Sequence, residues 1–314
     1  MKRFFGFAAV AAVIMSFASC QKEDGLTGSG KECVTEFTVQ IPQAEVTKTV
    51  SEGENVGFVY YEIWDSKFAN RLAYGKEEIV GGVMKTNFSL VKNQTYNFIF
   101  WAQKKFTGKE MPFSWETLKQ VKVDYSLFTE NNKDSYDAFY AVAEVLADGQ
   151  EKKVLLYRPF AQLNFGASTM TTSVGDFTIQ QQKVTVSGVS TLFNTVSGAA
   201  STDAAAISTV TFDAPKGGLV QAESTDKKDL KVGGNGYFWV SMNYFLVPGG
   251  KQANVEVKAK FVTSGGTVEH SVPSVRVEKN FRTNIVGDIF TSSSDFIIEV
   301  VPDFKVQDKD VIVE

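Results

Sequence analysis

The 314-residue chain has few side chains that could act as nucleophiles or soft metal ligands: two cysteines and one histidine. Cys20 follows an apolar N-terminal stretch, whereas Cys33 alternates with the apolar residues of a strand-like segment, where a buried thiol is expected. His270 lies on a second alternating segment, Thr267–Val272, where a surface imidazole is expected. So few thiols and imidazoles exclude disulfide frameworks and His-rich metal sites.

The remaining polar residues match no catalytic or metal-binding spacing. Gly25–Lys31 has the glycine and lysine spacing of a phosphate-binding loop, but Glu32 stands where that loop requires a hydroxyl. The acidic segment Asp124–Asp137 matches no calcium loop, so we expect it on the solvated surface. Two glycosidase carboxylates could meet only in space, and nothing in the sequence indicates such a pair. We therefore expect no catalytic residues, no metal and no cofactor.

The N-terminus has the order of parts found in an export signal. Residues 1–20 read MKRFFGFAAVAAVIMSFASC, with two basic residues, an apolar stretch too short to span a membrane, and small residues before Cys20. This order resembles a bacterial lipoprotein signal. We expect residues 1–19 to be removed as a signal peptide and Cys20 to carry the lipid. Residues 20–32 then form a lipidated flexible tether. An ordinary secretory signal with a chance cysteine is the alternative.

Composition predicts a folded protein made of strands. Hydrophobic residues make up 43% and charged residues 22% of the chain, as in globular proteins. There are 39 valines against 13 leucines, together with 26 phenylalanines, and these proportions favour strands over helices. The formal net charge of −4 argues against a general nucleic-acid partner.

Two series of strand-like runs divide the chain, with a restart of the pattern near Arg158. The first series is predicted at Cys33–Ile41, Val56–Trp64, Asn87–Val91, Thr95–Ala102, Val121–Tyr125, Asp137–Ala143 and Lys152–Tyr157. The second is predicted at Phe160–Gly166, Lys183–Val189, Ser208–Phe212, Tyr237–Asn243, Asn254–Val262, Thr267–Val272 and Val275–Glu278. A single helical turn is expected at Ser114–Lys119. The sequence thus predicts an all-β chain with two tandem β-sandwich domains, at 33–157 and 158–304, and a strand-like tail at 305–314.

The four tryptophans divide into two groups. Trp64, Trp101 and Trp239 lie inside apolar runs, where core packing is expected. Trp115 follows Pro112 and Phe113 in a loop-like region and is the candidate for stacking against a ligand.

Three segments resemble the fimbrillin (type V pilin) and Mfa-like surface lipoproteins of Gram-negative anaerobes. They are TKTVSEGENVGFVYYEIWD at Thr47–Asp65, YRPFAQLNFG at Tyr157–Gly166, and NFRTNIVGDIFTSSSDFIIEVVPDF at Asn280–Phe304. The resemblance implies β-sandwiches of transthyretin-like topology. It also implies cleavage after a basic residue in the loop that follows the first strand, and Lys48 is the matching residue. Family pilins carry arginine there, which puts cleavage by an arginine-specific protease in doubt.

In such pilins, loss of the first strand opens a groove that a strand from the next subunit fills. The donor candidates here are Lys305–Glu314 and the preceding Phe296–Val301. We expect a non-catalytic lipoprotein of the outer membrane or cell surface, acting as a structural, adhesive or accessory subunit of a fimbria. Its expected partners are the membrane, through the lipid on Cys20, and other fimbrial subunits. A surface carbohydrate-binding lipoprotein that uses Trp115 for a host or glycan ligand is the alternative.

Overall fold

The structure is a computed structural model, and it describes residues 21–22, 30–42, 56–106, 111–128, 136–172, 175–176, 179–214, 230–291 and 295–302. These residues are almost all in strands and turns. The helical segments whose bounds lie within them are two short 3-10 helices, η1 (Tyr125–Leu127) and η3 (Ala204–Ala206), and Tyr136 is a further residue in a 3-10 turn. The helical turn expected at Ser114–Lys119 is wrong, because this segment forms bends and a turn between two short strands. The all-β prediction is confirmed.

Two sheets from the first half of the chain pack face to face. One has the spatial order β1 (Gln21–Lys22), β4 (Arg71–Glu78), β3 (Val56–Asp65), β6 (Thr95–Lys104) and β9 (Ala138–Leu146). The other has the order β10 (Lys152–Leu155), β2 (Glu32–Gln40) and β5 (Val83–Val91). Aromatic rings fill the space between them, with Phe37 of β2 lying 4.5 Å from Phe98 of β6 between ring centroids.

A larger sheet comes from the second half of the chain. Its path is β21 (Gly266–Glu278), β20 (Gln252–Thr263), β14 (Ile179–Ser190), β19 (Asn235–Leu246), β11 (Phe160–Ala167), β22 (Phe281–Gly287) and β23 (Phe296–Pro302). Strand β17 (Ile207–Ala214) pairs with β14, and β18 (Leu230–Val232) pairs with β19. Strands β12 (Thr171–Thr172) and β13 (Gly175–Asp176) form a separate hairpin.

The large sheet folds over on itself. Strands β14 and β19 meet only at the pair Ser190–Leu246, so the sheet turns a corner there. Phe165 of β11 and Phe261 of β20 then lie edge to face across the interior, 5.7 Å apart between centroids. This second half is therefore also built as two layers around apolar side chains.

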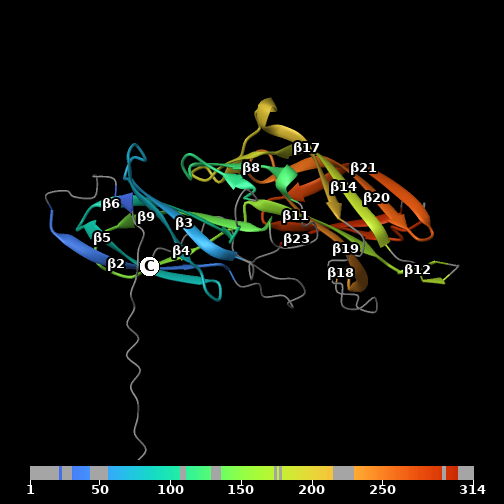
Figure 1. Ribbon diagram of the computed structural model, residues 1–314, viewed down its shortest axis with the longest axis horizontal. Coiled ribbons are helices and arrows are strands. Elements are labelled where there is room, and N and C mark those ends of the chain that lie inside the picture. Colours follow the sequence, from blue (N-terminus) through green and yellow to red (C-terminus); the bar gives the residue numbers. More distant parts are fainter. Residues whose placement is uncertain are drawn as a thin grey trace, which may run out of the picture.

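A small sheet made from both halves joins them. It contains β7 (Phe113–Ser114) and β8 (Gln120–Val123) from the first half, and β15 (Leu192–Asn194) and β16 (Ala199–Ala200) from the second. Strand β8 pairs with β15 along its length. Figure 1 shows β8 and β11 near the middle of an elongated molecule, with β2 and β5 at one end and β20 and β21 toward the other. Sequence analysis did not predict this shared sheet.

Tyr125 ties η1 to the corner of the large sheet. Its hydroxyl donates to the carbonyl of Ser190 and accepts from the amide of Leu246, both at 2.9 Å. Burial raises the pKa of Tyr125, although the Leu246 amide opposes that rise, so the phenol stays protonated and can serve both bonds. Lys279 makes a second link, because its ammonium donates to the hydroxyl of Tyr140 on β9.

A fully buried ion pair lies where the two halves meet. Arg158 donates three hydrogen bonds of 2.6 to 2.9 Å to the carboxylate of Asp137, and both side chains are 1% exposed. The guanidinium also lies 5.5 Å from the ring of Phe139 and 5.4 Å from that of Tyr244 on β19. Burial raises the pKa of Asp137, and the nearby Arg158 opposes that rise. The expectation that Asp124–Asp137 is solvated is therefore wrong at Asp137.

The C-terminal strand β23 belongs to its own sheet. It pairs antiparallel with β22 along seven residues, from Phe281–Pro302 to Gly287–Phe296. It is an edge strand, and Ile297 and Ile298 are 50% and 41% exposed. The prediction that Phe296–Val301 is a strand free to insert into another subunit is therefore wrong, because its backbone is already hydrogen-bonded to β22. The other donor candidate, Lys305–Glu314, lies outside the described residues.

We predict that Arg158→Met destabilises the protein by about 3–5 kcal/mol, because it leaves the Asp137 carboxylate buried without a partner. The double variant Asp137→Leu with Arg158→Met should recover most of this loss, since no uncompensated charge then remains. Urea unfolding measures both free energies. The control is Lys183→Met, which removes a surface pair with Asp213 in which both side chains are more than 40% exposed. A loss for Arg158→Met as small as that of the control would contradict a structural role for the buried pair.

Candidate functional site

Of the sequence-predicted site residues, Trp115 lies within the described part of the chain, whereas Cys20 and Lys48 lie outside it. Two candidate sites lie within the described residues: the first strand, and the surface around Trp115.

The first strand, β2, is held on both of its edges. It pairs antiparallel with β5 from Glu32–Val91 to Gln40–Val83, and parallel with β10 from Lys152–Phe37 to Leu155–Gln40. The alternation predicted from Cys33 is confirmed, because Thr35, Phe37, Val39 and Ile41 are all buried. Cys33 is only half-buried, at the start of this face, with its Sγ 4.0 Å from the hydroxyl of Thr35.

Phe37 is the centre of the face that β2 turns inward. Its ring lies 5.2 Å from Phe88 of β5 and 6.2 Å from Phe100 of β6 between centroids. Without β2, these rings and the inner edges of β5 and β10 would face solvent. The place that β2 occupies is thus an apolar slot with backbone hydrogen-bonding groups on both sides, which is what an added strand needs.

The three tryptophans predicted in the core lie there. Trp64, Trp101 and Trp239 are 5% exposed or less, and each indole N–H donates to an acceptor two residues away. Trp115 is half-buried, and its ring lies edge to face with Tyr60 of β3, 5.0 Å between centroids. Among the described residues, the N–H of Trp115 has no hydrogen-bond acceptor. Trp115 thus differs from the three core tryptophans in both exposure and bonding.

Two cations fix the loop that carries Trp115. Arg71 of β4 donates to the carbonyl of Glu116 at 3.2 Å and pairs with the buried carboxylate of Glu62 at 3.0 Å. The ammonium of Lys119 lies 3.4 Å from the ring centroid of Trp64. Burial lowers the pKa of Lys119, and the nearby carboxylates of Glu62 and Asp65 oppose this. The loop is therefore held in place before any ligand arrives.

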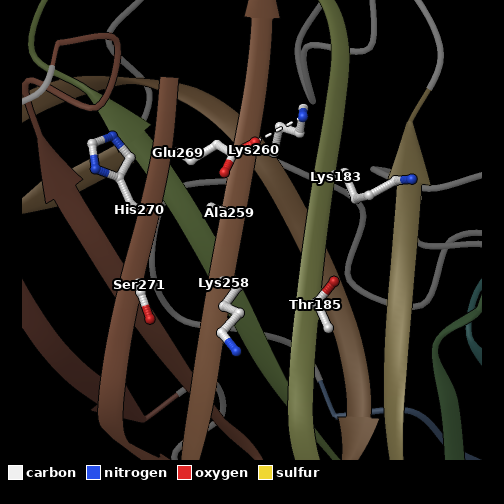
Figure 2. Close-up of a pocket in the computed structure, with 8 residues that line it drawn as sticks. All are labelled: Lys183, Thr185, Lys258, Ala259, Lys260, Glu269, His270 and Ser271. Atoms are coloured by element: carbon white, nitrogen blue, oxygen red, sulfur yellow. Dashed lines mark ion pairs between the residues drawn. The ribbon is translucent and has the colours of Figure 1, made fainter. Parts of the chain in front are cut away.

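A hollow of about 350 Å³ lies on the opposite half, over β14, β20 and β21 (Figure 2). Three lysines line it, and each contacts a carboxylate: Lys183 with Asp213 at 3.3 Å, Lys258 with Glu256 at 3.0 Å, and Lys260 with Glu269 at 2.7 Å. The Lys260 ammonium lowers the pKa of Glu269, which keeps that carboxylate charged at neutral pH. Because each of the three lysines contacts a carboxylate, the hollow offers a ligand no excess of positive charge.

His270 also borders the hollow, but the expectation that it is a surface residue is wrong. It is 8% exposed, and its Nε2 lies 2.7 Å from the carbonyl oxygen of Ile289. Its ring packs edge to face with Phe296 of β23, 4.8 Å between centroids. His270 thus anchors the chain between β22 and β23. Within the described residues, no cluster of histidine, cysteine and acidic side chains could hold a metal ion.

Residues 27–314 match the model of a family of unknown function, DUF6562. The chain belongs to this family. Comparison with curated protein sequences gives no match. In the described part of the chain, none of the helices has the length and apolar character needed to cross a membrane.

Solved structures resemble the chain at low sequence identity. A candidate cell adhesion protein from Bacteroides ovatus is 13% identical over 87% of this chain and 98% of its own, with a TM-score of 0.51. A candidate adhesin from Bacteroides ovatus is 11% identical over 88% and 95%, with a TM-score of 0.47. The tip fimbrial protein Mfa3 from Porphyromonas gingivalis, truncated at its C-terminus, is 12% identical over 86% and 98%, with a TM-score of 0.44. The first likeness shows the fold, and the expected β-sandwich architecture is confirmed.

Sequence analysis missed the residues around Trp115. Tyr60 was assigned to a strand buried on both faces, yet it is half-buried on the outer side of β3, and Lys76 lies opposite it on the unpredicted strand β4. An alternation of Phe58, Tyr60 and Glu62 within the apolar run could have indicated the outer face.

We predict that Trp115→Ala lowers the free energy of unfolding by about 1 kcal/mol, whereas Trp101→Ala lowers it by about 3–5 kcal/mol. The difference follows from the exposure of the two rings and from the buried bond of Trp101 to Gln103. Equilibrium denaturation of both variants measures it. Equal losses would mean that Trp115 is a core residue.

Proposed function

We propose that the protein is a non-catalytic subunit of a cell-surface fimbria, anchored through a lipid on Cys20 and able to assemble by strand exchange. The observation that carries the proposal is the position of β2, which lies between β5 and β10 and fills an apolar slot with its inward face. The export signal before Cys20 and the fold shared with a candidate cell adhesion protein support a surface location.

In this proposal the loop between β2 and β3 is the point of processing. Both strands are described, and Lys48 is the basic residue of the sequence between Pro42 and Phe58. Cleavage after Lys48 would separate β2 from the rest of the chain. Loss of β2 would leave the backbone N–H and C=O groups of β5 and β10 that face it unpaired. A strand of another subunit would restore the hydrogen bonds on both sides.

Lys305–Glu314 is the proposed donor. Val311 and Val313 alternate onto one face of an extended chain, as the side chains that fill a slot must. A donor from one subunit and a slot on the next give a head-to-tail contact, which propagates into a fibre instead of closing. If β2 is kept, the same chain serves as an anchor or accessory subunit.

A second candidate function is carbohydrate binding at the cell surface. It is favoured by the half-buried ring of Trp115 and by its indole N–H, which has no acceptor within the described residues.

We predict that deletion of Lys305–Glu314 abolishes polymers in protease-treated protein, because it removes the strand that fills the next slot. Val311→Asp with Val313→Asp should do the same, since charges cannot enter an apolar slot. The matched control is Asp308→Ala with Asp310→Ala, which should still polymerise. Size-exclusion chromatography and negative-stain microscopy measure polymer length. Unchanged polymers in the deletion, or none in the treated intact protein, would count against strand exchange.

A further inference from the structure

A strip of aromatic rings runs along the face of β3 that points away from the Phe37 core, and two of its rings, Tyr60 and Trp115, pack against the edge of the other apolar cluster. Phe58 and Tyr60 are two residues apart and therefore point to the same side of the sheet. Their centroids are 6.4 Å apart, and Trp115 adds a third ring 5.0 Å beyond Tyr60. All three side chains are half-buried. Because the contacts are edge to face, each pair leaves ring faces that its partner does not cover.

Two hydrogen-bond donors of this strip have no acceptor among the described residues: the indole N–H of Trp115 and the hydroxyl of Tyr60. By contrast, the three core tryptophans and the buried Tyr125 all have partners within the chain. Burial also raises the pKa of Tyr60, so its hydroxyl stays protonated near neutral pH and remains a donor. The strip therefore combines apolar ring faces with polar groups that are ready to bond.

Two ammonium groups lie over the ring of Phe58. Lys76, directly opposite Tyr60 on β4, lies 4.8 Å from the Phe58 centroid, and Lys105 lies 5.0 Å from it. Glu78 contacts Lys105 at 3.6 Å, but both side chains are more than 60% exposed, and such a pair is weak. No carboxylate of the described residues contacts Lys76. Each of the three lysines of the hollow over β20 contacts a carboxylate, whereas on this surface Lys76 contacts none of the described residues' carboxylates, so the strip carries an excess of positive charge.

We propose that this strip, made of Phe58, Tyr60, Trp115, Lys76 and Lys105, binds an acidic oligosaccharide. A sugar ring has an apolar C–H face that packs on an aromatic ring, and hydroxyls that accept hydrogen bonds from the N–H and O–H groups beside it. A carboxylate or sulfate on the next sugar lies toward the two ammonium groups. The bonds from Arg71 and Lys119 hold the Trp115 loop in place, so little ordering is needed on binding.

This inference deepens the second candidate function and does not depend on strand exchange, because the strip lies on β3 and β4 and not on β2. The binding assay uses unpolymerised protein, so its failure and a failure to polymerise are separate results.

The test is isothermal titration of the full mature chain with three acidic probes: tetragalacturonate, sialyllactose and a heparin tetrasaccharide. Methyl-esterified tetragalacturonate and lactose are the neutral counterparts. We expect binding of at least one acidic probe, and binding about tenfold weaker for its neutral counterpart where one is used. Trp115→Ala should lower the affinity for the acidic probe by about tenfold or more. Lys76→Gln is a surface change that leaves the fold intact, and it should lower the affinity for the same probe severalfold.

Lys258→Gln, in the hollow of the other half, is the matched control and should bind as the unaltered protein does. The inference is overturned if none of the three acidic probes binds, or if Trp115→Ala and Lys76→Gln bind like the control. It is also overturned if phosphatidylglycerol vesicles bind through the strip while the saccharides do not, because the partner would then be a membrane.

Discussion

The hydrogen bonding of β2 on both edges is the constraint on which the N-terminal half depends. Removing an edge strand from a sheet breaks the hydrogen bonds to one neighbouring strand. Strand β2 lies between β5 and β10, so its removal breaks the hydrogen bonds to two. It also brings Phe37 and Val39 into the core, both fully buried. An empty slot would be unfavourable in water, because it would expose apolar rings and leave backbone groups of β5 and β10 without their partners. Either β2 stays, or a strand of similar pattern takes its place.

The two halves of the chain share a sheet and an apolar core and are not joined by a linker alone. The pairing of β8 with β15 and the buried contact of Arg158 with Asp137 cross the border near Arg158 that we propose from sequence. A single apolar cluster extends from Trp101 in the first half to Phe261 in the second. In the proposed fimbria, the connection between the halves would carry tension without relying on a flexible linker.

The sequence predicted most of the fold because its long strands alternate or form apolar runs. Strand β2 was found from the alternation after Cys33, and β6 from the run that begins at Thr95. Strand β4 was missed because its sequence, RLAYGKEE, neither alternates nor forms an apolar run. Thr267–Val272 and Val275–Glu278, which were predicted as two strands, form the single strand β21, with Pro273 inside it.

The contacts between the halves could not be predicted in the same way. Strands β8 and β15 are short and far apart in sequence, so no local pattern links them. Asp137 was expected at the surface because its segment is polar, and His270 because it lies on an alternating strand. Each is instead buried against a partner that only the fold supplies. Trp115 could be singled out from its loop-like context, whereas Tyr60 and Lys76 join it only through the pairing of β3 with β4.

The most direct test of the removable first strand is the N-terminal sequence of the chains in polymers isolated from the cell surface. Cleavage after Lys48 predicts that these chains begin at Thr49 and lack β2, with acylated Cys20 confined to unprocessed anchoring subunits. Polymers in which every chain begins at Cys20 and still contains β2 would contradict assembly through the β2 slot.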